Sequence, residues 1–352
     1  MLTIVLAADP PAGYYNSAEG LSGTQLRQTL HNIIDNHDAQ SYGDLHDHYE
    51  ETDAKPNGKV WDMYSDNPGG TPPYEYDFIP ADQCGDYSGE GDCYNREHSW
   101  PGSWFNNQSV PRTDMFHVYP TDGYVNSHRG NLPYGEVGNA TWTSMNGSKK
   151  GSSNFPGYNG TVFEPIDEYK GDFARSYFYM STRYFNEDGG WSNSPMTDGA
   201  DLLNWAVNLL SQWHLADPVS EKELDRNDAV YDIQDNRNPF IDHPEYAGLL
   251  WGFTSVEDEI LEITNYELQN FPNPFNPSTT IYFSSEQNEQ VQIEIYNAKG
   301  QRVKQLLDIR NQTSVVWNGD DEKGNAVSSG IYYIVLKDAE TILTTKKCLI
   351  VK

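Results

Sequence analysis

The chain has 352 residues, which is too long for one ordinary hydrophobic core and predicts two domains. Its 23 Lys and Arg residues stand against 52 Asp and Glu residues, a formal net charge of −29. Proteins that bind nucleic acid by charge alone are usually basic, so this balance argues against a broad cationic binding surface. No stretch reaches the roughly 20 consecutive apolar residues that a membrane helix needs, which excludes stable insertion into a bilayer.

The first residues have the pattern of an export signal. The apolar run MLTIVLAA ends in small residues and is followed at once by the turn-rich DPPAG. This pattern is typical of the end of a cleaved export signal, although the run lacks a basic leading region. A trimmed start or a buried first strand is the alternative. We therefore assign residues 1–18 to a leader or its remnant, and expect a secreted or cell-surface protein.

Helical spacing organises the region from residue 22 to about 255. Residues 22–37 carry apolar side chains at helical intervals after Ser22, a plausible N-cap. Residues 59–65, KVWDMYS, are typical of a short strand. Two further helices are predicted over residues 167–186 and 200–217.

Two groups within this region have competing interpretations. His46 and His48 in LHDHYEE suggest a metal site, but side chains two residues apart do not share a helix face. A solvated polar loop is the preferred interpretation. Tyr177, Met180 and Tyr184 are spaced as one helix face and are expected to pack in the core.

The three cysteines suggest one short crosslink. Cys84 and Cys93 are separated by eight loop-forming residues, and Cys348 is alone near the end. A disulfide between the first two would suit an exported protein. Two free thiols remain an alternative, and a zinc half-site would need two further ligands that this segment does not offer.

The composition changes near Tyr266. Residues 266–352 hold 9 Lys and Arg against 10 Asp and Glu, whereas residues 1–265 hold 14 against 42. Short alternating runs separated by turns predict six or seven strands and a small β-sandwich. No predicted strand carries a histidine or a carboxylate pair, so this domain is expected to be an accessory module. We place it at residues 264–352, after a catalytic domain at 19–263.

The residues with the chemistry of an active site lie between Tyr94 and Asn131. This segment contains the Glu97–His98 pair and the Asp114–His117 segment. Hydrolysis of a phosphodiester needs a base that activates water and a cation that neutralises the phosphoryl oxygens. Neighbouring side chains on a strand point to opposite faces, so Glu97 and His98 can share one site only where the strand bends or ends.

These motifs resemble a known family. REHSWP, followed by TDMFHVYP and GYVNSHRGN, is similar to the bacterial endonuclease I family of His-Me finger (ββα-metal) nucleases. The resemblance extends through EPIDEYKGDFARSYFYM to QDNRNPFIDHPE and covers about residues 20–255. It implies an α+β fold with His98 as the general base. Glu97 and Asn126 would then be ligands of a magnesium-like ion, with calcium or manganese as alternatives.

The resemblance also assigns supporting roles. Asp114 and His117 are expected to be structural supports of the finger. Asn126 is expected to begin a helix after the turn at residues 120–123, and a capping role alone is the alternative.

One cationic side chain should hold the cleaved phosphate. Arg112, Arg129 and Arg175 are the candidates. Arg175 is preferred because it lies on a predicted helix that resembles a family segment. A surface salt bridge is the alternative role for each of the three in so acidic a chain.

The C-terminal module has a resemblance of its own. YELQNFPNPFNPSTTI, IEIYNAKGQRV and SSGIYYIVLK are similar to the C-terminal sorting domain of the type IX secretion system. This implies export through that secretion machinery, with removal of the domain afterwards as an option.

Together these features predict a secreted, metal-dependent endonuclease of low sequence specificity, expected to be a monomer. It would act on DNA, and RNA is a second possible substrate, leaving 5′-phosphate ends. A catalytically silent cell-surface binding protein with the same fold is the alternative, for which the acidic charge is the main motive. A hydrolase of another ester is a third interpretation.

Overall fold

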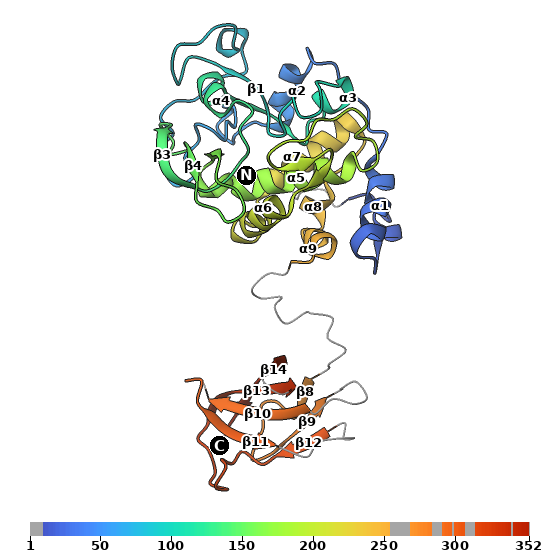
Figure 1. The fold of residues 1–352 in the computed structure, drawn as a ribbon, viewed down its shortest axis with the longest axis vertical. Coiled ribbons are helices and arrows are strands. Elements are labelled where there is room, and N and C mark those ends of the chain that lie inside the picture. Colours follow the sequence, from blue (N-terminus) through green and yellow to red (C-terminus); the bar gives the residue numbers. More distant parts are fainter. Residues whose placement is uncertain are drawn as a thin grey trace, which may run out of the picture. The chain divides into compact units, whose positions relative to one another are not determined.

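The structure is a computed structural model, and it describes residues 10–253, 268–283, 291–297, 299–306, 314–338 and 341–351. The chain divides into two compact units, Met1–Phe253 and Thr254–Lys352, which are drawn in Figure 1. The signal-like run at residues 1–8 lies outside the described residues.

The first unit mixes helices with short antiparallel strands, as the predicted α+β class requires. Its helical elements are η1 (Asn16–Ala18), α1 (Gly23–Ile34), α2 (Leu45–Thr52), η2 (Pro80–Asp82), α3 (Ser109–Arg112), α4 (Gly123–Arg129), η3 (Asp167–Tyr169), α5 (Lys170–Arg183), α6 (Asn204–Ala216), α7 (Glu221–Gln234), α8 (Pro239–Asp242) and α9 (Glu245–Trp251). Its strands are β1 (Tyr94–His98), β2 (Val118–Asp122), β3 (Val137–Thr143), β4 (Lys149–Ser153), β5 (Thr161–Glu164), β6 (Thr197–Asp198) and β7 (Asp201–Leu202).

Two strands and one helix form the unit that carries the predicted site. Strand β1 pairs antiparallel with β2, so that Tyr94 lies opposite Asp122 and His98 opposite Val118. Helix α4 follows β2 directly. Asp122 is its N-cap, and the Asp122 Oδ1 atom accepts a hydrogen bond from the Val125 amide at 2.7 Å. This cap satisfies one of the free amides at the helix start and fixes where α4 leaves the strand.

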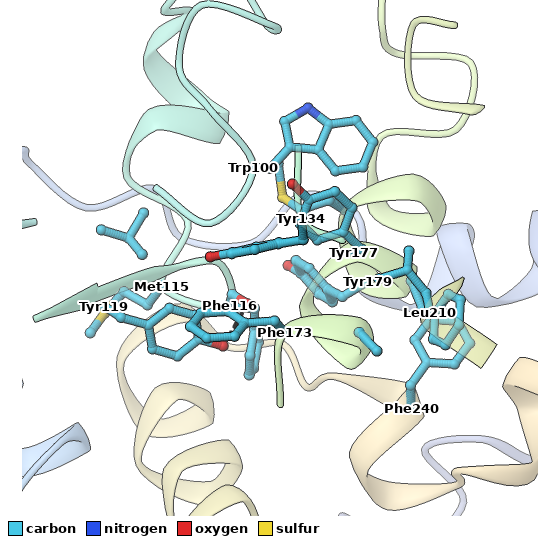
Figure 2. Packing of buried hydrophobic residues seen from close by; sticks show 14 of the residues in the cluster. Trp100, Met115, Phe116, Tyr119, Tyr134, Phe173, Tyr177, Tyr179, Leu210 and Phe240 are labelled. Atoms are coloured by element: carbon cyan, nitrogen blue, oxygen red, sulfur yellow. Dashed lines mark hydrogen bonds between the residues drawn. The ribbon is translucent and has the colours of Figure 1, made fainter. Parts of the chain in front are cut away.

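Helix α5 is the centre of the first core. All of its residues from Lys170 to Arg183 are buried, and it lies in the middle of the first unit in Figure 1. Tyr177 and Met180 pack into the cluster of buried residues, and Tyr184 is 3% exposed, which confirms the predicted stripe. Figure 2 shows the aromatic rings of this cluster close to Trp100, which follows β1. The core therefore supports the end of β1 directly.

Two local expectations about secondary structure were wrong. Residues 45–52 form helix α2 and not a loop, because Leu45, Tyr49 and Thr52 recur at helical spacing and are all buried. The segment 59–65 is not a strand, and Val60 makes only an isolated bridge to Ala54. This segment instead turns back on itself through hydrogen bonds to the Asp62 carbonyl.

The leader assignment also extends too far along the chain. Tyr15 and Ala18 are buried in the core of the first unit. The Tyr15 hydroxyl donates a hydrogen bond to Asp242 Oδ2 at 2.7 Å. The folded unit therefore begins before residue 19.

The second unit is a sandwich of two antiparallel sheets, as predicted. One sheet has the order β11-β10-β13-β14 and the other β12-β9-β8. The strands are β8 (Leu268–Phe271), β9 (Thr279–Phe283), β10 (Val291–Asn297), β11 (Arg302–Leu306), β12 (Ser314–Trp317), β13 (Gly330–Asp338) and β14 (Thr341–Ile350). Alternate residues of these strands, including Ile293, Ile295 and Trp317, form a separate apolar core.

Cys84 and Cys93 form the predicted disulfide, and Cys348 is a buried free thiol. The disulfide packs against the start of α4, where a side chain at Gly123 would collide with Cys84 Sγ. Among the described residues, no helix is both long and apolar enough to cross a membrane.

Candidate active site

A polar pocket of about 320 Å³ opens where β1 ends beside α4. Glu97 and His98 come from β1, and Asn126 comes from α4. The pocket is lined by Tyr42, Arg96, Glu97, His98, Pro101, Gly102, Ser103, Asn107, Arg112, Asn126, Arg129, Gly130 and Asn131. The structure thus brings the three principal predicted residues to one cavity.

One ring nitrogen of His98 is held by the backbone. Its Nε2 atom lies 3.0 Å from the carbonyl oxygen of Arg112. A carbonyl oxygen only accepts hydrogen bonds, so Nε2 carries the ring proton and Nδ1 retains its lone pair. Nδ1 has no hydrogen-bond partner among the described residues. Burial and the neighbouring His117 lower the pKa of His98 to about 3, so the ring is neutral at pH 7.

Glu97 is buried, with 1% of its surface exposed. Its Oε1 atom accepts the Tyr64 hydroxyl at 2.9 Å and lies 3.0 Å from Arg129 Nη1. Burial raises the pKa of Glu97, while Arg129 opposes that rise by stabilising the carboxylate. The carboxyl group is therefore held in place by a hydroxyl and a guanidinium.

Arg129 organises the end of β1. Its Nη1 donates to the His98 carbonyl at 2.7 Å, and its Nη2 donates to the Ser99 carbonyl. The side chain is 1% exposed, and it also contacts Glu97. Arg129 therefore holds Glu97 and the backbone that follows it, while its Nε atom is buried without a hydrogen-bond partner.

Asn126 presents one atom to the pocket. Its Nδ2 donates a hydrogen bond to Asn95 Oδ1 at 2.7 Å. This contact fixes which end of the amide faces Asn95 and leaves Asn126 Oδ1 without a hydrogen-bond donor from the described chain. Asn126 lies within α4 and does not begin it, and Asp122 supplies the cap. Both the expected start at Asn126 and the capping alternative are therefore corrected.

Arg112 is a cationic side chain that the pocket leaves available. It is half-buried, lines the cavity and makes no ion pair with a described carboxylate. Its guanidinium carbon lies 4.0 Å from the centre of the Tyr42 ring. Arg96 lies at the same distance from that ring and donates to the Tyr42 carbonyl at 2.8 Å. Tyr42 therefore orients two guanidinium groups at the pocket wall.

Asp114 and His117 lie behind the pocket and contact the core. The carboxylate of Asp114 accepts the hydroxyls of Tyr179 and Tyr184, each at 2.9 Å. His117 Nε2 lies 2.6 Å from the Pro111 carbonyl oxygen. Both residues are fully buried. Neither residue lines the cavity.

Comparisons with known proteins agree with this geometry. Residues 22–245 match the endonuclease I family, which is more than half of the chain. The chain belongs to the endonuclease I family. Residues 276–341 match the FlgD Ig-like domain, in agreement with the sandwich.

Two relatives of this endonuclease are named extracellular ribonucleases. The one from Bacillus subtilis (strain 168) is 35% identical over 262 residues, which is 71% of this chain and 83% of the relative. The one from Bacillus amyloliquefaciens is 37% identical over 247 residues, 68% of this chain and 78% of the relative. These matches support a secreted nuclease. Endonuclease-1 of Buchnera aphidicola subsp. Acyrthosiphon pisum (strain APS) is 24% identical over 130 residues, 37% of this chain and 44% of that protein.

The structure does not bring Arg175 to the pocket of the endonuclease. Arg175 is 0% exposed, and its Nη2 donates to Glu223 Oε2 at 2.8 Å. Its Nη1 donates to the Asp217 carbonyl at 2.9 Å. A fully buried and paired guanidinium cannot reach a phosphate, so its preference over the other arginines was wrong. Arg175 lies on the side of α5 opposite Tyr177, and it is buried because α5 is covered on all of its faces.

Several residues of the site were missed from the sequence. Asn95 precedes the conspicuous Glu97–His98 pair and carried no separate signal. Tyr42 and Tyr64 lie far from the motif along the chain, and only the fold brings them to it. Tyr134, whose hydroxyl lies 2.8 Å from that of Tyr64, completes this buried polar group.

Proposed function

We propose that this protein is a secreted, magnesium-dependent endonuclease that hydrolyses phosphodiester bonds of DNA and RNA with little sequence specificity. The observation that carries the proposal is the meeting of Glu97, His98 and Asn126 at one pocket. The β1–β2–α4 arrangement supports the His-Me finger assignment, because two antiparallel strands and one helix supply these residues.

The donor atoms suit a hard divalent cation. Glu97 offers a carboxylate oxygen and Asn126 offers an amide oxygen, and magnesium prefers oxygen ligands together with several waters. Arg129 also pairs with Glu97, so the ion would share that carboxylate with a guanidinium. When bound, the ion would neutralise charge on the phosphate and on the leaving oxygen. Calcium and manganese are alternatives that the same donors accept.

His98 would remove a proton from the attacking water. Its Nδ1 atom holds the free lone pair, because Nε2 is committed to the Arg112 carbonyl. The low pKa of the ring keeps it in the basic form at neutral pH. Proton transfer of this kind contributes about 10²–10⁴-fold to a rate. Arg112 would bind a non-bridging phosphate oxygen from the pocket wall, where no described carboxylate competes for it.

Low specificity follows from the kind of contacts in the pocket. The groups assigned to substrate binding would contact phosphate, and phosphate carries no sequence information. The net charge of −29 disfavours additional binding away from the pocket. The names of the two Bacillus relatives favour RNA as one substrate, and the family assignment favours DNA as another.

Export by the type IX secretion machinery is part of this proposal. It rests on the sequence resemblance of residues 264–352, and the Ig-like fold is compatible with it. Production in a bacterium with that machinery, with and without the C-terminal domain, tests it by the amount of nuclease outside the cell. Equal release of both forms would contradict the sorting role.

The activity is tested with the full chain on plasmid DNA and on a single-stranded RNA. Cleavage should stop when EDTA is present and return when magnesium is added in excess. The products should carry 5′-phosphate ends, which a ligation assay on nicked plasmid detects. His98→Ala should slow cleavage by about 10²–10⁴-fold, while the control His243→Ala, outside the pocket, should cut normally. Undiminished cleavage in EDTA would contradict the proposal.

A further inference from the structure

A second group of metal-ligating side chains lies in the first unit, outside the pocket. His31 and Asp35 belong to the end of α1, and Glu187 follows α5. One ligand atom from each of the three residues lies within 4.8 Å of the other two. None of them lines the pocket that holds Glu97 and His98. This group is therefore independent of the proposed catalytic ion.

The imidazole of His31 has one ring nitrogen bound to the backbone and the other free to bind a metal. Its Nδ1 atom lies 2.9 Å from the carbonyl oxygen of Arg183. The carbonyl can only accept, so Nδ1 carries the proton and Nε2 has the free lone pair. Metal-binding histidines commonly donate their other ring nitrogen to a backbone carbonyl in this way, which fixes the ring and its tautomer.

The free nitrogen of His31 faces the carboxylates without a hydrogen bond of its own. His31 is only 6% exposed, so its ring is fixed by packing. The Nε2 atom lies 3.9 Å from Glu187 Oε1, which is too long for a hydrogen bond, and no other described residue bonds to it. The histidine is buried as a residue, and its unbonded ring nitrogen lies within 4.8 Å of a carboxylate oxygen from each of Asp35 and Glu187, so it is available as a ligand.

The two carboxylates can complete the set with small movements. Ligands of a tetrahedral zinc ion with bonds of about 2.1 Å lie about 3.4 Å apart. Glu187 is exposed and Asp35 is half-buried, so both can shorten the present separations by rotating. Glu187 uses Oε2 for its ion pair with Arg183 Nη1 at 2.8 Å, which leaves Oε1 for a metal.

We propose that His31, Asp35 and Glu187 bind one zinc ion or a similar transition metal. An imidazole nitrogen with two carboxylates favours such metals over magnesium and calcium, which prefer oxygen ligands alone. Water would occupy the remaining position on the exposed side. The bound metal would link the end of α1 to the segment after α5 and so stabilise the first unit.

Zinc titration of the chelator-treated full chain tests this site. Excess magnesium is kept present to occupy the oxygen-lined pocket, and binding is followed by calorimetry and by the melting temperature. The wild type should take up one zinc ion per chain and melt at a higher temperature with zinc, because binding to the folded state alone stabilises it. Asp35→Asn and Glu187→Gln should each weaken zinc binding by about tenfold or more.

The controls separate this site from the catalytic one. Both variants change side chains at the periphery and avoid a cavity at His31. Glu50→Gln, an exposed change on α2, should bind zinc like the wild type. Magnesium-dependent cleavage should stay unchanged in all three. Zinc binding that is equally tight in the Asp35→Asn/Glu187→Gln double variant, or no zinc-dependent shift in the wild type, would overturn the proposal.

Discussion

The two units of this endonuclease differ in the charged residues that they bury. In the first unit, several ion pairs are removed from solvent, including Arg129 with Glu97 and Arg175 with Glu223. In the described part of the sandwich, Glu294 is the one charged residue that is buried. Burying a charge costs free energy that an apolar core would not require. In the first unit, the buried ion pairs hold polar groups in fixed positions despite this desolvation cost. A catalytic site needs such fixed positions.

The comparison also separates two kinds of buried arginine. Arg129 contacts the strand end that carries the site, whereas Arg175 joins α5 to α7. The same residue type therefore serves the active site in one place and the scaffold in the other.

The largest predicted effect concerns the scaffold arginine. Arg175→Met removes the partner of Glu223 and leaves a buried carboxylate without its cation. We expect the free energy of unfolding to fall by about 3–5 kcal/mol, measured by urea denaturation. Folded protein at low temperature should keep its cleavage rate. A large loss of kcat with unchanged stability would instead return Arg175 to the role of phosphate ligand.

Arg112→Ala should show the opposite pattern. The side chain lines the pocket, and no described carboxylate pairs with it, so its loss should affect the substrate and leave the fold intact. We expect kcat/KM to fall by about 10- to 100-fold, since a charge-assisted contact to phosphate contributes about 1.5–3 kcal/mol. The control Arg27→Ala removes a guanidinium paired with Asp201, outside the pocket. Equal activity of the two variants would rule out Arg112 as the phosphate ligand.

Asn95→Ala should have a smaller effect. Asn95 holds the amide of Asn126 so that the oxygen faces the pocket. Removing this contact should weaken magnesium binding by about tenfold, as for other residues that orient a metal ligand. The cleavage rate should recover at high magnesium concentration. A rate that stays low at saturating magnesium would show that Asn95 acts on something other than the metal ligand.

The smallest predicted effect lies in the sandwich. Burial alone would raise the pKa of Glu294, but hydrogen bonds from Tyr296, Lys337 and Arg302 lower it to about 2 from an ordinary 4.5. The carboxylate therefore stabilises the sandwich fully above pH 4.5, and this contribution is lost as the pH falls towards 2. Glu294→Gln should lower the melting temperature of the sandwich at pH 7. Calorimetry should show that the difference from wild type shrinks below pH 4.5; a difference independent of pH would contradict this origin.

The sequence predicts elements well where one local pattern decides them. The apolar spacing of Tyr177, Met180 and Tyr184 identified α5, and the alternating runs after Tyr266 identified the sandwich strands. The helix over residues 45–52 was not predicted from the sequence. The interpretation of that segment rested on its two histidines, and the weaker helical spacing of Leu45 and Tyr49 was not used.

The candidate site was predicted only in its central part. Glu97, His98 and Asn126 stand in a motif that can be read along the chain. The arginine could not be assigned, because whether Arg175 or Arg112 reaches the pocket depends on how α5 packs against α7. The contacts of Tyr42 and Tyr64 have no local signal, since tertiary packing alone brings them to β1.

Magnesium affinity and cleavage rate, measured together in two variants, test the central claim most directly. His98→Ala should bind magnesium like the wild type but cleave about 10²–10⁴-fold more slowly, because it loses only the base. Asn126→Ala should bind magnesium more weakly and regain part of its rate when magnesium is raised. Cleavage at the wild-type rate by His98→Ala, or unchanged magnesium affinity in Asn126→Ala, would contradict the account.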